Sequence, residues 1–449
     1  MAQGALPGFR DFYPAEFAQR AYITRIWREV ARRYAFVEYD GPPLEPLDLY
    51  TKKSGDEIVG QLYNFTDKGG REVALRPEMT PTLARMVAAR ANALRKPVRW
   101  FSVPQLFRYE RQQKGRLREH FQLNVDILGE ADVSADAELL AVAIDIMREF
   151  GLSPDDVRAR VSDRRLLRAL LDRLGVREEQ VPAVFGVIDK IERQPREISA
   201  EKLTALGLNA ESVDALLRIT EHATIEELRA RYGDDRTVAQ RLDELARYHQ
   251  YLEQLGVADW VDLDLSIVRG LAYYTGIVFE LFDARGELRA ICGGGRYDSL
   301  LGALGGVELP ALGFGMGDVV LGELLRARGL TDVPAGEPDF WVAADGEDRA
   351  REVMSAATVL RRVRASVEYA LRPQSLSKQK KAAFSAGASY FVILASDFAQ
   401  SRKIEVQPLL PVEGLHGEPL DDLIAKRPST LDELLEVIRA NPDVLPSVD

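Results

Sequence analysis

Residues 107–122 read Phe107-Arg108-Tyr109-Glu110-Arg111-Gln112-Gln113-Lys114-Gly115-Arg116-Leu117-Arg118-Glu119-His120-Phe121-Gln122. Two extended, β-like stretches flank a loop in this segment, and Gly115 allows the chain to turn within it. Five of the eleven positions from Arg108 to Arg118 are basic. Arginine side chains bind phosphate oxygens bidentately, so the loop favours an anionic ligand, although charge runs are also typical of solvated hairpin tips.

Further extended segments lie on both sides of this hairpin. They are expected at residues 61–66, 73–76, 99–103, 106–110, 121–128, 263–268, 272–282, 288–292 and 312–316. Helices are expected at residues 16–34, 80–95 and 134–150, and after the last strand as far as about residue 328. Runs of strands joined by polar turns predict an α+β fold, with a mostly antiparallel sheet and flanking helices.

The composition and pattern of the sequence change twice beyond this region. Residues 161–260 are rich in Leu, Ala, Arg and Glu with few β-like runs, which predicts a helical insertion between residues 1–160 and 261–328. Residues 329–338 contain Gly, Asp, Thr and two prolines and predict a linker. Residues 339–449 alternate strand and helix patterns, so we expect a separate α/β domain there.

Composition excludes several classes of protein. The chain has 449 residues, of which 46% are hydrophobic and 29% charged, and its formal net charge is −11. A uniformly basic nucleic-acid-binding surface is therefore excluded, and a single cysteine, Cys292, permits no internal disulfide or cysteine-based zinc site. The four histidines lack metal-ligand spacing, so no protein-bound metal is expected. Because no signal peptide or membrane-length apolar run is apparent, we expect a soluble, cytoplasmic protein without membrane contact.

The Arg-x-Glu pattern, the basic loop and the glutamine-bearing strand resemble motif 2 of the class II aminoacyl-tRNA synthetases. The run Gln113-Lys114-Gly115-Arg116 is similar to the histidyl-tRNA synthetase family in particular. Three further segments resemble motifs of that family in order and spacing: Leu75-Arg76-Pro77-Glu78-Met79-Thr80, Arg269-Gly270-Leu271-Ala272-Tyr273-Tyr274-Thr275-Gly276 and Gly294-Gly295-Arg296-Tyr297-Asp298. The resemblance implies a class II catalytic core in residues 1–160 and 261–328, with a C-terminal anticodon-binding domain.

The resemblance also implies a reaction. In this family the histidine carboxylate attacks the α-phosphorus of ATP, giving histidyl-adenylate and pyrophosphate, and the histidyl group then passes to the 3′ end of tRNA(His). A carboxylate is already ionised near neutral pH, so no general base is needed. Catalysis would then come from alignment and charge balance on the phosphoryl oxygens, with Mg²⁺ accompanying ATP.

Site residues follow from the matched motifs. By resemblance, Arg108 binds the α-phosphate, Glu110 reads the adenine amino group, and Arg269 meets the α-phosphate and carboxylate from the other side. The implied ATP site also includes Arg118, His120 and Phe121, with His120 at the position of the family's adenine-stacking Phe. The implied histidine-binding residues are Glu78, Thr80, Gln122, Asp126, Tyr273 and Tyr274.

One departure from the family lies in its third motif. That motif usually ends in an arginine that holds the γ-phosphate, and Val320 occupies the position here. A charge-assisted hydrogen bond is worth roughly 1.5–3 kcal/mol, so its loss should weaken ATP binding or turnover. Our hypothesis is that Arg116, Arg118 or a Mg²⁺ ion compensates.

The C-terminal domain has a charge pattern of its own. Residues 361–403 contain nine basic and two acidic residues, a net charge of +7 that suits a phosphate backbone. A solvated helix face is the alternative interpretation. The resemblance implies tRNA contacts by Arg372, Lys378, Lys380 and Lys381. The overall resemblance also implies a homodimer, although Pro42 and Glu45 match the family's interface motif only loosely.

Two other functions are compatible with such a core. One is a non-catalytic, histidine-sensing paralogue such as the regulatory subunit of ATP phosphoribosyltransferase, and the other is an RNA-binding sensor. The regulatory subunit usually lacks the anticodon-binding domain and the second arginine, whereas Arg269 and residues 339–449 are present here. Only Val320 favours an inactive core, so the sequence predicts a histidine–tRNA ligase.

Overall fold

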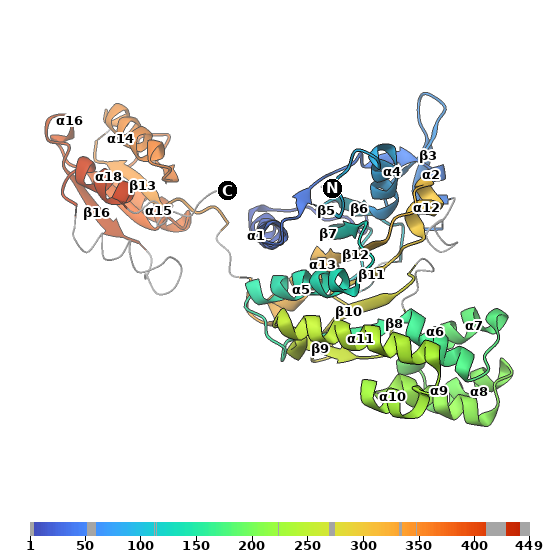
Figure 1. Cartoon of the computed structure of the whole chain (residues 1–449). Coiled ribbons are helices and arrows are strands. Elements are labelled where there is room, and N and C mark those ends of the chain that lie inside the picture. The colour runs from blue at the N-terminus through green and yellow to red at the C-terminus, as the bar shows by residue number, and fades with distance from the viewer. Residues whose placement is uncertain are drawn as a thin grey trace. The chain divides into compact units, whose positions relative to one another are not determined.

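A computed structural model describes residues 4–51, 60–111, 113, 115–222, 224–268, 274–331, 335–346, 348–409 and 428–440. The chain divides into two compact units, residues 1–333 and 334–449 (Figure 1). In the described part of the chain, no helix is both long enough and apolar enough to cross a membrane.

The first unit is built on a nine-stranded sheet, counted over its described residues. The strand order is β1-β5-β7-β12-β11-β10-β8-β9, and β6 also pairs with β7. Every pairing from β5 to β8 is antiparallel, whereas the edge strands β1 and β9 pair in parallel, so the sheet is mixed. The bounds are β1 Val37–Glu38, β5 Val98–Ser102, β6 Gln105–Phe107, β7 Glu119–Leu128, β8 Val157–Asp163, β9 Val261–Leu263, β10 Ile277–Asp283, β11 Cys292–Arg296 and β12 Ala311–Gly317.

Helices cover both faces of this sheet. Trp27, Leu140 and Leu324, from α1, α5 and α13, share one core with Leu123, Val125 and Ile127 of β7. On the other face, Leu83 and Val87 of α4 pack with Leu300 and Leu301 of α12. The bounds are α1 Pro14–Arg33, α4 Thr80–Arg90, α5 Val133–Glu149, α12 Leu300–Gly305 and α13 Asp318–Ala327.

A small antiparallel sheet with the order β2-β4-β3 lies beside the residues that lead into α4. Its elements are β2 Leu44–Pro46, α2 Asp48–Thr51, β3 Tyr63–Thr66 and β4 Glu72–Leu75.

The segment between β8 and β9 is helical, as its composition predicts. Leu167, Val184 and Leu216 lie in a core of their own within it. Its elements are α6 Arg164–Arg173, η1 Glu178–Gln180, α7 Val181–Ile188, η2 Ile191–Arg193, α8 Arg196–Ala205, α9 Ala210–His222, α10 Ile225–Tyr232, α11 Arg236–Gln254 and η3 Ala258–Trp260. The side chains of Thr224 and Asp235 cap α10 and α11.

The second unit is a mixed α/β sheet, which confirms the predicted class of this part. The strand order is β14-β13-β15-β16, and only the β15–β16 pairing is antiparallel among its described strands. Phe340 and Val342 pack on one face with α14 and α18, while Trp341 packs on the other face with Ala383 of α15. The bounds are β13 Phe340–Ala344, α14 Ala350–Arg362, β14 Val367–Glu368, α15 Leu376–Ser385, β15 Tyr390–Leu394, α16 Phe398–Ser401, β16 Ile404–Pro408 and α18 Leu431–Ala440.

Two predicted strands are displaced. The strand expected at 263–268 lies at 261–263, and the strand expected at 288–292 lies at 292–296. The second strand therefore contains the glycine run Gly293–Gly295, whose missing side chains left no alternation to detect.

Candidate active site

A cavity of about 320 Å³ opens over the centre of the main sheet, within the size range of small-molecule sites. Its walls come from β7, β11 and β12, from the start of α4, and from the basic loop between β6 and β7. Eight of the predicted site residues line it: Glu78, Thr80, Arg108, Glu110, His120, Gln122, Asp126 and Tyr274. Segments up to 196 residues apart in the chain therefore meet at one place, as the motifs imply.

The alternation of β7 explains how one strand serves both the core and the cavity. Leu123, Val125 and Ile127 are buried in the hydrophobic core, whereas Gln122, Asn124 and Asp126 line the cavity on the other face. The neighbouring strand β12 has Gly313 and Gly315 where these side chains lie. A Cβ atom at Gly313 would overlap with the Asp126 carboxylate, and one at Gly315 with the Gln122 amide.

One end of the cavity is cationic. The carboxylate of Glu110, which is 8% exposed, lies 2.5 Å from Nε of Arg116 and 4.0 Å from Nη1 of Arg108. Nε of Arg108 donates to the carbonyl oxygen of Pro77 at 2.9 Å, which uses only part of its five-donor set. Two guanidinium groups for one carboxylate leave this end with an excess of positive charge, which suits an anionic ligand.

His120 lies beside this cationic end. Its Nε2 atom is 3.2 Å from Oε1 of Gln122. Burial, together with the positive charge of Arg108, lowers the pKa of His120 to about 4. The imidazole is therefore neutral at pH 7, and its flat ring suits stacking on an uncharged aromatic base.

The opposite end contains the buried carboxyl of Asp126. Burial raises the pKa of Asp126 to about 7, and the hydrogen bond from the Tyr297 hydroxyl to Oδ1 opposes this shift. Near neutral pH this carboxyl is divided between its two protonation states. It is therefore an acceptor that can ionise when a ligand brings an N–H group to it.

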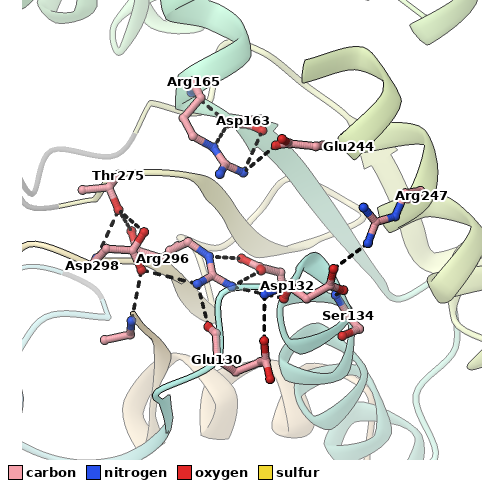
Figure 2. Close-up of polar contacts among 12 residues, drawn as sticks. Glu130, Asp132, Ser134, Asp163, Arg165, Glu244, Arg247, Thr275, Arg296 and Asp298 are labelled. Atoms are coloured by element: carbon pink, nitrogen blue, oxygen red, sulfur yellow. Dashed lines mark hydrogen bonds and ion pairs between the residues drawn. The ribbon is translucent and has the colours of Figure 1, made fainter. Parts of the chain in front are cut away.

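A buried ionic network fixes the strand end next to Tyr297. Arg296, which is 2% exposed, contacts both carboxylate oxygens of Asp136 on α5 and donates to the carbonyl oxygen of Glu130 at 2.9 Å (Figure 2). The carbonyl oxygen of Arg296 accepts from the amide of Thr275 at 2.7 Å. Separating such a pair would leave an unpaired buried charge, which costs free energy. The pair therefore holds β11 against α5.

Two of the other predicted residues, Arg118 and Phe121, are described but do not line the cavity. The guanidinium of Arg118 lies 4.2 Å from the ring centre of Tyr109, and its Nε donates to the carbonyl oxygen of Glu110 at 3.3 Å. The ring of Phe121 lies under the guanidinium of Arg20 at 4.4 Å. Arg269 and Tyr273 lie outside the described residues, so their roles stay predictions.

The structure adds residues that the sequence reasoning assigned to no site role. Tyr297 and Asn124 line the cavity, and Tyr297 bonds directly to Asp126. Tyr297 belongs to a quoted glycine-rich motif, but its contact with β7 depends on strand neighbours that are remote in sequence. Asn124 could have been found from the period-two alternation that Gln122 and Asp126 define.

In the described residues, no group of three or more His, Cys, Asp or Glu side chains is placed to hold a metal ion. The cavity instead joins a cationic end, a neutral imidazole and a buried carboxyl over a glycine-lined sheet. Such a site can bind an anionic aromatic ligand and a polar amino compound side by side, and can align them for reaction without a general base.

The mainly antiparallel sheet, with its arginine–glutamate hairpin and glycine-lined floor, is the catalytic fold of a class II aminoacyl-tRNA synthetase. A protein-family model described as Histidyl-tRNA synthetase matches residues 8–317. The chain belongs to the histidyl-tRNA synthetase family, as the motifs predict.

Individual relatives agree with this assignment. Histidine--tRNA ligase from Opitutus terrae is 44% identical over 409 residues, covering 90% of this chain and 93% of the relative. The relative from Arabidopsis thaliana named "Histidine--tRNA ligase, chloroplastic/mitochondrial" is 38% identical over 402 residues, covering 90% and 82%. The crystal structure of histidyl-tRNA synthetase from Nostoc sp. PCC 7120 superposes with a TM-score of 0.83 at 23% identity, covering 98% of this chain and 99% of that chain, and supports the fold alone.

Proposed function

We propose that the protein is a histidine–tRNA ligase that activates histidine with ATP and transfers it to the 3′ end of tRNA(His). The observation that carries this proposal is the cavity, in which eight residues predicted from three separate motifs come together. The family membership of the chain supports the same conclusion. A catalytically inactive sensor would not need the cationic end of the site, where Arg108 and Arg116 line the cavity.

ATP is assigned to the cationic end. Arg108 binds the α-phosphate, Glu110 accepts from the adenine amino group, and His120 stacks on the base. Glu110 is held in place by Arg116, whose Nε lies 2.5 Å from it. We assign Arg116 to the phosphates in preference to Arg118, because Arg116 lines the cavity whereas Arg118 packs on Tyr109.

We assign histidine to the end of the cavity that contains the Asp126 carboxyl. Glu78, Thr80 and Gln122 supply acceptors for its ammonium group, and Asp126 accepts from the imidazole. Tyr274 walls this part of the cavity. The histidine carboxylate then forms a bond to the α-phosphorus while the bond to the β-phosphate oxygen breaks, and the electron pair leaves with pyrophosphate.

Mg²⁺ is included as the counter-ion of ATP. This ion is usually held by one or two carboxylates together with phosphate oxygens and water. Glu287 and Glu323 line a second cavity that adjoins the cationic end, and they are the carboxylates that would hold it. When bound, the ion would neutralise part of the phosphate charge.

The remaining partners are also part of the proposal. tRNA would contact Arg372, Lys378, Lys380 and Lys381 in the second unit, all of which are exposed. A homodimer and a cytoplasmic location complete it. Sedimentation and cell fractionation would test these last two points.

Histidine-dependent exchange of pyrophosphate into ATP tests the proposal. The wild-type protein should catalyse the exchange, and Arg108→Ala should lower its rate about 100- to 1000-fold, because a preorganised donor to the developing phosphoryl charge is lost. Arg90→Ala, on the exposed end of α4, serves as the matched control and should leave the rate unchanged. Absence of exchange in the wild-type protein, with histidine still raising its melting temperature, would identify a sensor instead.

A further inference from the structure

The wall of the cavity formed by α13 contains no cation. Val319 and Val320, from the first turn of this helix, line the cavity, and Glu323 follows one turn later. Val320 also lines the second, adjoining cavity, so it lies at the junction of the two. An anionic group that extends past this junction finds only apolar and acidic side chains on α13.

Arg289 reaches the same junction from the other side. It lies in the connection between β10 and β11 and lines the second cavity with Gln113, Gly115 and Val320. A Cβ atom at Gly115 would be 3.4 Å from Cγ2 of Val320, 3.8 Å from Oε2 of Glu323 and 3.9 Å from Cδ of Arg289. Gly115, Val320 and Arg289 therefore surround one point at the edge of the catalytic cavity.

The guanidinium of Arg289 is available for a ligand. Its hydrogen bond is to the side-chain oxygen of Gln113, at the tip of the basic loop. Among the described residues, no carboxylate lies within 4.0 Å of the Arg289 guanidinium, the distance that defines an ion pair. Glu287 and Glu323 nevertheless line the same cavity. Arg289 is exposed, so its remaining donors face solvent and not a protein partner.

The other described arginines near this end each contact another protein group, and none of them lines the cavity that contains Arg289. Arg116 pairs with Glu110 at 2.5 Å, and Arg118 packs on the ring of Tyr109. Arg108 donates to the carbonyl oxygen of Pro77 at 2.9 Å. Of the arginines described here, Arg289 is the one that borders Val320 without a carboxylate partner.

We propose that Arg289 binds the terminal phosphates of ATP, which leave as pyrophosphate, and so supplies the cation that Val320 does not. This inference rests on the proposed function, because it takes the cationic end as the ATP site. An ATP molecule with its α-phosphate at Arg108 extends its other phosphates along the basic loop toward Gly115. Arg289 meets them there with the bidentate geometry that suits phosphate oxygens.

The test compares ATP with AMP, which lacks the two terminal phosphates. Arg289→Ala should weaken ATP binding about 10- to 100-fold, the effect of losing one charge-assisted hydrogen bond. AMP and histidine should bind as they do to the wild-type protein. Arg285→Ala, an exposed arginine of the same connection that lines neither cavity, is the matched control and should bind ATP normally.

Two further variants separate phosphate binding from loop positioning. Gln113→Leu removes the contact of Arg289 with the loop but keeps the guanidinium, so it should retain most of the ATP affinity. Val320→Arg in the Arg289→Ala background places a guanidinium at the same junction and should recover ATP affinity. If Gln113→Leu reproduces the full loss, or if Arg289→Ala weakens AMP as much as ATP, the inference is wrong. A wild-type protein that binds neither nucleotide would overturn the proposed function itself.

Discussion

At the scale of single residues, the protonation of Asp126 makes the stability of the folded protein depend on pH. Burial raises its pKa to about 7 in the folded protein, whereas an unfolded aspartate titrates near 4. Between these values the folded state binds more protons than the unfolded state, so stability falls as the pH rises through this window. The slope from this one group is at most about 1.4 kcal/mol per pH unit. Above about pH 7 the loss of stability from this group is complete and no longer changes with pH.

We therefore expect Asp126→Asn to gain stability relative to the wild-type protein as the pH rises from 5 to 7.5. Urea unfolding of both proteins across this range measures the difference. The pKa of His120 is lowered to about 4, so this residue makes stability rise with pH below its ordinary pKa. Its contribution is the same in both proteins and cancels in the difference. A difference that stays constant with pH would show that Asp126 titrates as an ordinary aspartate.

At the scale of elements, the glycines of β11 and β12 serve two distinct purposes. A Cβ atom at Gly315 would overlap with the end of the flexible Gln122 side chain, which can move. A Cβ atom at Gly294 would overlap with the backbone of Gly313 and with Phe314, which cannot. Gly315→Ala should thus raise the KM for histidine at least about tenfold, the effect of one misplaced hydrogen bond, with little change in melting temperature. Gly294→Ala should instead destabilise the fold by about 1–3 kcal/mol.

Steady-state exchange kinetics and thermal unfolding of the two variants check this contrast. Gly322→Ala is the control, since a Cβ atom there approaches nothing closer than 3.8 Å inside α13, and it should stabilise the helix by up to about 1 kcal/mol. Equal losses of stability in the Gly315 and Gly294 variants would contradict the assignment of Gly315 to the site.

These elements also show which parts could be predicted from the sequence. The strand β7 was predictable because its alternation and its motif agree on which face lines the site. The glycine strand β11 was misplaced, because glycines have no side chains to alternate and their position depends on pairing with β10 and β12. The contact of Tyr297 with Asp126, 171 residues apart, likewise depends on strand order, which local patterns do not contain. The parallel pairing of the edge strands β1 and β9 also depends on strand order and was not predicted.

At the scale of the whole molecule, the segment proposed to bind tRNA differs in charge from the rest of the chain. The protein has a net charge of −11, yet residues 361–403 have a net charge of +7. Lys378 and Lys381 lie three residues apart on α15, so they share one face of this helix. Phe384 on the same helix is 60% exposed, which offers a ring for stacking on an unpaired base. In the proposed mechanism, the residues assigned to histidine activation all belong to the first unit, whereas binding of tRNA would also use this basic helix.

Lys378→Glu combined with Lys381→Glu should therefore leave histidine-dependent pyrophosphate exchange unchanged and lower kcat/KM for tRNA aminoacylation about 10- to 100-fold, because two phosphate contacts become repulsive. The loss should shrink at high salt, where counterions screen the reversed charges. Arg439→Glu, exposed on α18 of the same unit, is the control and should affect neither assay. If the double variant aminoacylates tRNA normally, the basic face of α15 is only solvated surface. If exchange falls as well, the effect is on folding, and tRNA contact by this helix is not supported.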